Sequence, residues 1–389
     1  MFSTRVPNDL GPNSLTRAIQ AARAGGAAII DLTETNPTRV GLEYPADLLG
    51  PLSSGAGRVY RPHPFGLPAA REAIAAECQA SGLPVEAGRL VLTASTSEAY
   101  SFLFKLLCDS GDEVLVPAPS YPLFEHLTRL DAIESRSYPL EYHGTWSIDL
   151  PALEESVTPR TRVVLVVSPN NPTGSLIGRG DLDRLARTCA SRGLALVGDE
   201  VFADYLLDPR PDHVSVLNQD QALAFSLGGL SKSAGLPQLK LGWITAGGPS
   251  SLVGDALSRL EVVADAYLSV STPVQEAVGP LLAHGREIRQ RILDRIRDNL
   301  GRLEAAAAVA PACSVLRVEG GWSAVVRVPA TRTEERLVLD LLERDGVLVH
   351  PGYFFDFPRE AYLVVSLLPP PVAFQAGVER LFARVPADA

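Results

Sequence analysis

The chain has 389 residues, of which 46% are hydrophobic and 21% charged, and its formal net charge is −10. This length favours two domains over one simple core. The acidic balance disfavours a surface for nucleic acid or an anionic membrane, and no run of about 18 apolar residues indicates a transmembrane helix.

Cysteine and histidine usage argues against disulfides and metal catalysis. The four cysteines lie far apart without a CxxC spacing, and the six histidines form no HxxxH pair. Free thiols in a reducing compartment are therefore expected. The N-terminus, MFSTRVPNDLGPNS, lacks the basic and then apolar layout of a secretion signal. We expect a cytoplasmic protein without a metal site.

The N-terminal part mixes irregular segments with short elements. A helix is expected over Leu15–Arg23 and a strand over Ala28–Leu32, before a turn at Asn36-Pro37. Gly57–Pro68 is again irregular, and a helix is expected over Ala69–Ala80. We expect this region to begin as an arm that joins a smaller C-terminal domain.

Regular alternation of strands and helices begins at Leu90. Apolar runs predict strands at Leu90–Thr93, Glu113–Val116, Val163–Val167, Leu194–Val197, Ala222–Leu227 and Leu241–Ala246. Asp181–Ser191 has apolar residues at helical spacing and Gly193 as its stop. Continuous Val/Leu runs between helices indicate a mostly parallel sheet covered on both faces.

The C-terminal part changes character. A helical region from about Pro249 to Ala308 breaks near Ser271–Pro273. Beyond it, we expect strands at Trp322–Val328, Val347–His350 and Tyr362–Leu367, a helix at Glu334–Arg344 and a final helix. This pattern indicates a smaller α+β domain. The predicted division is 1–50 (arm and part of the small domain), 51–285 (large domain) and 286–389 (small domain).

One lysine-bearing loop, Ser226–Trp243 (SLGGLSKSAGLPQLKLGW), bridges two predicted strands. The chain has only three lysines, Lys105, Lys232 and Lys240, and its other cations are arginines. Arginine stays protonated in proteins, whereas lysine can form a Schiff base. Small residues around Lys232 at a strand edge suit such chemistry, although a surface lysine in a polar turn fits the loop equally well.

The segment after the strand at Leu90–Thr93 is a candidate anion site. Ser95 and Glu98 form an S-x-x-E capping box, which predicts a helix from Ser95 to about Cys108. The N–H groups around Thr96 and Ser97 would face an anion, with hydroxyls beside them. Because capping boxes are common, the motif alone predicts only a helix start. Lys105, on the same helix, is expected to be solvated.

Three further strand ends carry polar or aromatic groups, and ligands of open α/β sheets bind at such ends. SPNNPTG (168–174) would present Asn171 as a donor, unless it is a plain turn. Asp199 leaves an apolar strand and so needs a cationic partner, either a ligand atom or an arginine. Tyr121 follows a strand and could stack on a ring or pack in the core.

These groups together match pyridoxal 5′-phosphate: an anion site, a stacking ring, an amide, a carboxylate and a Schiff-base lysine. A carboxylate beside the pyridine nitrogen keeps it protonated, so the ring can accept electrons from a carbanion. No GxGxxG follows a strand and no GxxxxGK[ST] occurs, so these nucleotide-binding motifs are not indicated.

The ordered motifs resemble those of the class I/II aminotransferases, which are fold-type I enzymes that use pyridoxal 5′-phosphate. The similar segments are Tyr60–Ala75, GDEVLVPAPSYP (111–122), SPNNPTG (168–174), DEVF (199–202), LSKSAGLPQLKLGW (230–243) and VLVHPGYFF (347–355). The resemblance covers nearly the whole chain. It implies an α/β fold with a large domain, whose mostly parallel, seven-stranded-type sheet lies between helices, and a smaller α+β domain.

The resemblance implies roles around the cofactor ring. Lys232 would form the Schiff base and then move a proton between the substrate Cα and the cofactor. Asp199 would pair with the ring nitrogen, Asn171 would bond the ring oxygen, and Tyr121 would stack on the ring. Phe202 stands where the family usually has a tyrosine that bonds the ring oxygen, and we expect its presence to raise the pKa of the Schiff base.

At the phosphate, the resemblance assigns contacts to Ser95, Thr96, Ser97, Lys240 and the partner subunit's Tyr60. A homodimer with shared active sites is therefore expected. Two positions depart from the family here: Gly229 replaces a serine, and Lys240 replaces an arginine. Lys240 keeps the positive charge but lacks the planar two-donor fork.

The substrate side departs further. In relatives, a TyrLeuArgLeuSer-type segment carries the arginine that binds the substrate carboxylate, but here Val364 takes that place in TyrLeuValValSer. Either another cation binds the carboxylate, or the substrate amine lacks one there. By resemblance, the candidate substrate residues are Thr35, Asn36, Arg39, Arg61 and His63, although most charged residues are simply exposed.

Three functions remain open on the sequence. An aminotransferase would pass an amino group from an amino acid or related amine to a 2-oxo acid by a ping-pong mechanism. A β-lyase or another Cα-carbanion enzyme would use the same cofactor differently. A non-catalytic cofactor-sensing module is disfavoured by the acidic balance and by the absence of an N-terminal helix-turn-helix. The expected partners are an amino donor, a 2-oxo acid and a second copy of the chain.

Overall fold

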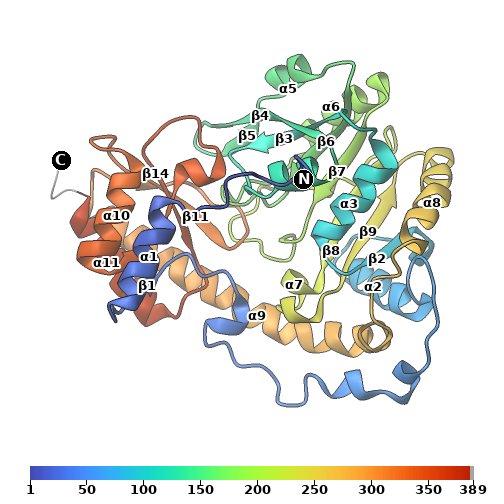
Figure 1. Ribbon diagram of the computed structural model, residues 1–389, viewed down its shortest axis with the longest axis horizontal. Helices are drawn as coiled ribbons and strands as arrows, with labels where there is room; N and C mark the ends of the chain where they lie inside the picture. Colours follow the sequence, from blue (N-terminus) through green and yellow to red (C-terminus); the bar gives the residue numbers. More distant parts are fainter. Residues whose placement is uncertain (386–389) are drawn as a thin grey trace.

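The computed structural model describes residues 1–385, and the last residues of the predicted small domain, 386–389, lie outside them. Its main feature is an eight-stranded sheet in the order β2-β9-β8-β7-β6-β3-β4-β5 (Figure 1). The strands are β2 (Leu90–Thr93), β3 (Glu113–Ala118), β4 (Glu134–Tyr142), β5 (Trp146–Ile148), β6 (Thr161–Val167), β7 (Ala195–Asp199), β8 (Ala224–Gly229) and β9 (Gly242–Gly247). The neighbours from β4 to β8 pair in parallel, which confirms the mostly parallel sheet.

The sheet has one strand more than the seven-stranded type because β4 and β5 form a hairpin at its edge. Neither strand is among those expected from the sequence. In β4 only Tyr138 and Leu140 are buried, and the exposed Ser137, Pro139 and Glu141 alternate with them. An edge strand with one solvated face lacks the continuous apolar run that identified the central strands.

Helices cover both faces of this sheet (Figure 1). The helices α3 (Thr96–Leu107), α4 (Phe124–Leu130) and α8 (Ser250–Asp265) share one buried cluster with strand residues. The opposite face packs against α5 (Leu150–Ser156), α6 (Arg179–Arg192), α2 (Pro68–Ala80), α7 (Leu230–Ser233) and α9 (Thr272–Ala308). This sandwich confirms the α/β class. The short 3-10 turns are η1 (Pro37–Arg39), η2 (Gly50–Ser53), η3 (Gly55–Arg58), η4 (Ala87–Arg89), η5 (Pro237–Leu239) and η6 (Gly352–Phe355).

Two helix ends follow directly from local sequence. Ser95 is the N-cap of α3, and its hydroxyl accepts the Glu98 amide at 3.2 Å, while the Glu98 carboxylate accepts the Ala94 amide. Gly193 ends α6 with a φ of 66°, a left-handed conformation that favours glycine. Lys105 is exposed, as expected, and its amine also bonds Asp131 and Ser101.

A second, smaller group of strands lies apart from the large sheet, on the left in Figure 1. It contains the antiparallel sheet β10 (Ser314–Val315), β11 (Ser323–Arg327), β14 (Tyr362–Ser366) and β13 (His350–Pro351), and the parallel pair β1 (Ile30–Asp31) and β12 (Val347–Leu348). The helices α1 (Ser14–Ala24), α10 (Glu334–Asp345) and α11 (Pro371–Arg384) accompany it. The N-terminal segment contacts this part through β1, which pairs with β12, and through α1, which packs against α10.

The expected strand Val347–His350 is in fact two strands in different sheets. Its first half pairs with β1, and its second half pairs with β14. The chain changes sheets at Val349, and the second residue of β13 is Pro351, which has no N–H to donate. The predicted boundary between residues 285 and 286 falls inside the single helix α9, and the division into domains stays a prediction.

Candidate active site

Four of the predicted cofactor residues lie at or just after the ends of strands at one edge of the large sheet: Asp199, Lys232, Asn171 and Tyr121. Asp199 ends β7, and Lys232 lies in α7 directly after β8. Asn171 follows β6, and Tyr121 follows β3. The strands β2, β3, β6, β7 and β8 all run in the same direction, so their carboxyl ends share this edge. The topology therefore brings together residues as distant in the sequence as Tyr121 and Lys232.

Asp199 is held by a tyrosine that the sequence reasoning missed. The Tyr100 hydroxyl donates to Asp199 Oδ2 at 2.7 Å, and the Val201 amide donates to Oδ1 at 3.3 Å. Burial raises the pKa of Asp199, while these bonds and the nearby Lys232 oppose that rise. The only signal in the sequence was spacing, because Tyr100 stands one helical turn after Thr96 on α3.

Lys232 lies between aromatic rings. Its Nζ is 4.5 Å from the ring centre of Trp322 and 5.2 Å from that of Phe202. Burial lowers the pKa of Lys232 to about 8, and the Asp199 charge opposes this. The Tyr205 hydroxyl donates to the Lys232 carbonyl at 2.6 Å and fixes the backbone of α7. Phe202 thus offers an apolar face to the amine, where relatives would offer a hydroxyl nearby.

Asn171 is oriented by the second group of strands. Its Oδ1 accepts the Ser323 hydroxyl at 3.3 Å, and its Nδ2 has no acceptor within residues 1–385. The neighbouring Asn170 is structural: it is buried, donates to the Pro119 carbonyl and the Thr173 hydroxyl, and accepts from Ser120. Asn170 therefore ties the Asn171 loop to the loop that carries Tyr121.

Tyr121 keeps an open ring face. Its side chain is 44% exposed and meets Phe124 edge-on, with ring centres 6.3 Å apart. Burial and the nearby Asp199 charge raise the pKa of Tyr121, so the phenol stays protonated. The arrangement leaves the ring able to stack on a flat ligand above Asp199.

The phosphate candidates converge on the start of α3. Thr93 and Gly229 both pair with Gly242 of β9, whose Cα lies next to the Ser95 backbone at the start of α3, and Lys240 stands two residues before Gly242. Lys240 is exposed and forms no hydrogen bond or ion pair within the described part of the chain, and Ser95, Thr96 and Ser97 are partly exposed. A side chain at Gly229 would be crowded, because a Cβ there would lie 3.2 Å from Leu241 O and Gly242 Cα.

Val364, which stands at the expected carboxylate-binding position, is buried in a hydrophobic cluster. It is 2% exposed on β14, and its register partners are Val325 of β11 and His350 of β13. The cluster around it includes Phe355 and other apolar side chains. His350 Nδ1 is buried without a partner in residues 1–385, and burial lowers the pKa of this histidine.

The loop at residues 33–39 borders β14. The Ser366 hydroxyl donates to the Glu34 carbonyl at 2.7 Å, which places Thr35 and Asn36 beside that strand. Asn36 accepts from the Thr38 amide and hydroxyl and so caps η1, while Thr35 is exposed. Arg39 is 73% exposed and lies 3.7 Å from the Glu34 carboxylate. None of these side chains is therefore an obvious group to bind a substrate carboxylate.

Tyr60, Arg61 and His63 line a small cleft of their own with residues of the α8–α9 connection. Arg61 is paired with Glu276 at 2.7 Å, and His63 is exposed. Tyr60 is 73% exposed and has no hydrogen bond within residues 1–385. Within one chain, these three side chains have no contact with Lys232 or Asp199.

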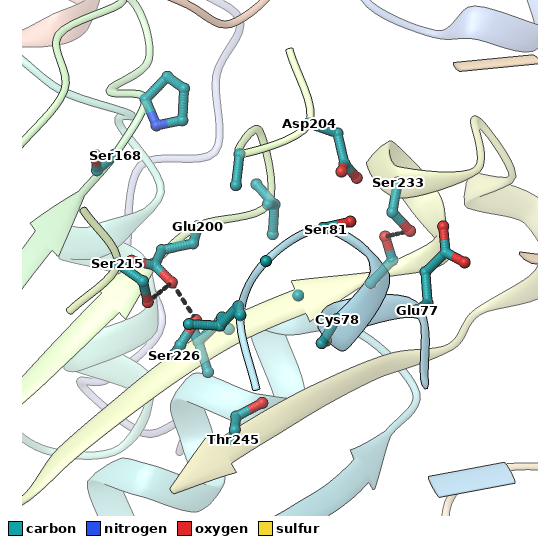
Figure 2. A pocket seen from close by; sticks show the side chains of 18 of the residues that line it. Glu77, Cys78, Ser81, Ser168, Glu200, Asp204, Ser215, Ser226, Ser233 and Thr245 are labelled. Carbon is teal, nitrogen blue, oxygen red and sulfur yellow. Dashed lines mark hydrogen bonds between the residues drawn. The ribbon is translucent and has the colours of Figure 1, made fainter. Parts of the chain in front are cut away.

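A separate cavity of about 350 Å³ lies on the opposite face of the sheet from α3 (Figure 2). Ser226 and Thr245 line it, whereas their neighbours Phe225 and Ile244 pack on the α3 side. Glu200 is one of the acids that line it, and its carboxylate accepts hydrogen bonds from the Ser215 and Ser226 hydroxyls (Figure 2). It also accepts the Val216 amide. Because these polar groups are already paired, this cavity does not compete with the site at Lys232.

No group of three or more histidine, cysteine or acidic side chains within residues 1–385 is arranged to hold a metal ion. No helix in that range is long and apolar enough to cross a membrane. All four cysteines are free thiols.

Known proteins provide a comparison for this fold and site. The family model described as aminotransferase class I and II matches residues 47–369. The glutamate-pyruvate aminotransferase AlaA of Escherichia coli is 26% identical over 88% of this chain and 87% of its own length. An alanine aminotransferase of Mycobacterium tuberculosis is 28% identical over 92% and 86%, respectively.

Solved structures agree on the fold. An alanine aminotransferase from Pyrococcus furiosus superposes with a TM-score of 0.88 at 22% identity and covers the full length of both chains. The family match extends over most of the chain and includes β7, α7 and β14. The chain belongs to the class I and II aminotransferase family and has its fold-type I architecture.

Proposed function

We propose that this aminotransferase binds pyridoxal 5′-phosphate on Lys232 and transfers an amino group from an amino acid or related amine to a 2-oxo acid by a ping-pong mechanism. Enzymes of this family and fold generally depend on that cofactor. The observation that carries the proposal is the convergence of Lys232, Asp199 and Asn171 at one sheet edge beside the start of α3.

The chemistry of the donor set fits the cofactor. Asp199 would hold the pyridine nitrogen, Asn171 Nδ2 the ring oxygen, and Tyr121 the ring face. The start of α3 offers N–H groups, and Lys240 offers an unpaired charge for the phosphate. When bound, the cofactor supplies an electron sink for a carbanion at the substrate Cα.

Lys232 is suited to move a proton at the substrate Cα. Its pKa of about 8 lies close to neutrality, which lets the amine release and accept a proton at working pH. Asp199 provides a fixed negative charge, and the rings of Phe202 and Trp322 keep water from the amine. Asp199 and Lys232 each oppose the burial effect on the other's pKa.

Substrate choice rests on fewer observations. Relatives named for alanine, glutamate and pyruvate make these the first compounds to test. Val364 means that the carboxylate contact would have to come from groups other than the usual arginine. The exposed Tyr60 supports a homodimer in which this residue reaches the partner subunit's site. The cytoplasmic location stays a prediction from the sequence.

The decisive experiment supplies purified protein with pyridoxal 5′-phosphate and a panel of amino donors, without an acceptor. Conversion of the bound cofactor to its pyridoxamine form, one equivalent per site, is expected with at least one donor. A 2-oxo acid should then restore the original absorbance and yield a new amino acid. Release of ammonia and a 2-oxo acid without that conversion would instead identify a lyase, and an absence of cofactor absorbance would overturn the proposal.

A further inference from the structure

The contact between Tyr100 and Asp199 lies beneath the proposed ring position and was not part of the expected site. Tyr100 is 3% exposed, and burial raises its pKa well above the ordinary value, so the hydroxyl remains a donor. It gives Asp199 Oδ2 a bond of 2.7 Å, whereas Oδ1 accepts only the longer bond from Val201. Tyr100 therefore makes the shorter of the two hydrogen bonds to this carboxylate.

The Tyr100 ring is itself fixed by neighbours. It meets Phe124 edge-on, with ring centres 5.5 Å apart, and it lies 6.0 Å from Phe104 on its own helix. Phe124 in turn meets Tyr121 edge-on. One aromatic row therefore connects the support of Asp199 with the proposed stacking ring, and the hydroxyl has little freedom to leave the carboxylate.

We propose that Tyr100 is a positioning residue that keeps Asp199 ionised and oriented, and thereby keeps a pyridine nitrogen bound to Asp199 protonated. This inference rests on the proposed function. The physical reason is that a hydrogen bond to the charged form of a group favours that form. The nitrogen and carboxylate can share their proton as an ion pair or as a neutral pair, and the Tyr100 bond favours the ion pair.

The same helix would then hold both ends of the cofactor. The first turn of α3 faces the proposed phosphate position, and Tyr100 acts one turn later through Asp199. A shift of α3 would consequently change both contacts together. This arrangement gives Tyr100 a role that packing alone would not require, because a phenylalanine would fill the same ring position.

The test compares Tyr100→Phe with Tyr138→Phe in the cofactor-loaded protein. Tyr138 is the matched control: it is 1% exposed on β4, and its hydroxyl donates to the Leu165 carbonyl at 2.7 Å. The primary readout is the ¹⁵N chemical shift of pyridoxal 5′-phosphate labelled at the ring nitrogen. We expect this signal to move toward the unprotonated value in Tyr100→Phe and to stay at the wild-type value in Tyr138→Phe.

A second readout is the dissociation constant of pyridoxal 5′-phosphate, which should rise about three- to tenfold in Tyr100→Phe. In Asp199→Asn, which removes the negative charge, adding Tyr100→Phe should change the dissociation constant less than twofold. A wild-type ¹⁵N shift in a folded Tyr100→Phe protein, or equal effects in the two tyrosine variants, would overturn the inference. Failure of the proposed function would differ, because the wild type itself would then bind no cofactor.

Discussion

The proposed cofactor edge (the ends of β7 and β8 with the start of α3) and the proposed substrate side (around β14) differ in the charged groups that they contain. At the edge formed by β7, α7 and α3 lie Asp199, Lys232 and the exposed Lys240, which has no ion pair within residues 1–385. Tyr100 donates a hydrogen bond to Asp199. On the β14 side, Val364 is buried among apolar groups, and Arg39 and Arg61 lie beside acids of their own. The proposed cofactor residues thus gather at one edge of the sheet, whereas the proposed substrate side has the buried Val364 and two arginines that already lie beside acids.

This difference indicates which part of the reaction each region governs. The cofactor chemistry needs fixed charges at fixed distances, so its residues stand on strand ends and helix starts. Substrate choice depends on what surrounds the substrate, and loops can change that without disturbing the sheet. We therefore expect this protein to keep the cofactor chemistry of the family but to differ from it in substrate specificity.

Replacing Lys232 tests the cofactor edge most severely. Lys232→Ala should lower turnover by at least about a thousandfold, because it removes the proposed Schiff-base and proton-transfer group. It should also abolish the visible absorbance of lysine-bound cofactor. Lys105→Ala is the matched control, since Lys105 lies on the far part of α3 and bonds Asp131. Retained absorbance in Lys232→Ala would refute the assignment.

Restoring the family's arginine tests the substrate side. Val364→Arg should lower the free energy of unfolding by about 3 kcal/mol or more, because a charge would enter an apolar cluster. Thermal denaturation measures this, with Val364→Leu as the control for volume. An unchanged melting temperature together with a lower KM for amino acids would show that the site accommodates the arginine, and it would remove the contrast between the two regions.

The neighbouring asparagines separate scaffold from site. Asn170→Ala should lower the free energy of unfolding by about 2–3 kcal/mol, because it removes two buried hydrogen bonds to the 119–120 loop and one within its own loop. Asn171→Ala should leave stability nearly unchanged but weaken cofactor binding. Denaturant titrations and cofactor titrations of both variants check this. The reverse pattern would exchange the two assignments.

The pH dependence of amine labelling gives the smallest effect and a direct view of Lys232. Its pKa is lowered from 10.5 to about 8 because burial disfavours the charged form. In the cofactor-free protein, labelling should therefore rise about tenfold per pH unit up to about 8 and then level off. Peptide mass spectrometry can follow each of the three lysines. A plateau only near 10 would show that the amine is not desolvated.

The central strands and most helices could be predicted because their signals are local. The buried runs of β6 and β7 are apolar throughout, and the capping box at Ser95 and the stop at Gly193 mark helix ends. The hairpin β4–β5 could not be predicted in this way, since its burial depends on neighbours that only the fold supplies. The split between β12 and β13 has the same cause: two sheets share one extended segment.

For the site, the sequence by itself determined which residue types were available: one lysine after a strand, one acid at a strand end, and a valine where relatives have arginine. These follow from composition and motif order, which require no coordinates. Only the tertiary structure decided that Tyr100 supports Asp199 and that Trp322 and Phe202 cover Lys232. The reason is physical: hydrogen bonds and desolvation depend on distances across the fold, and residues 99 positions apart have no local signal of their contact.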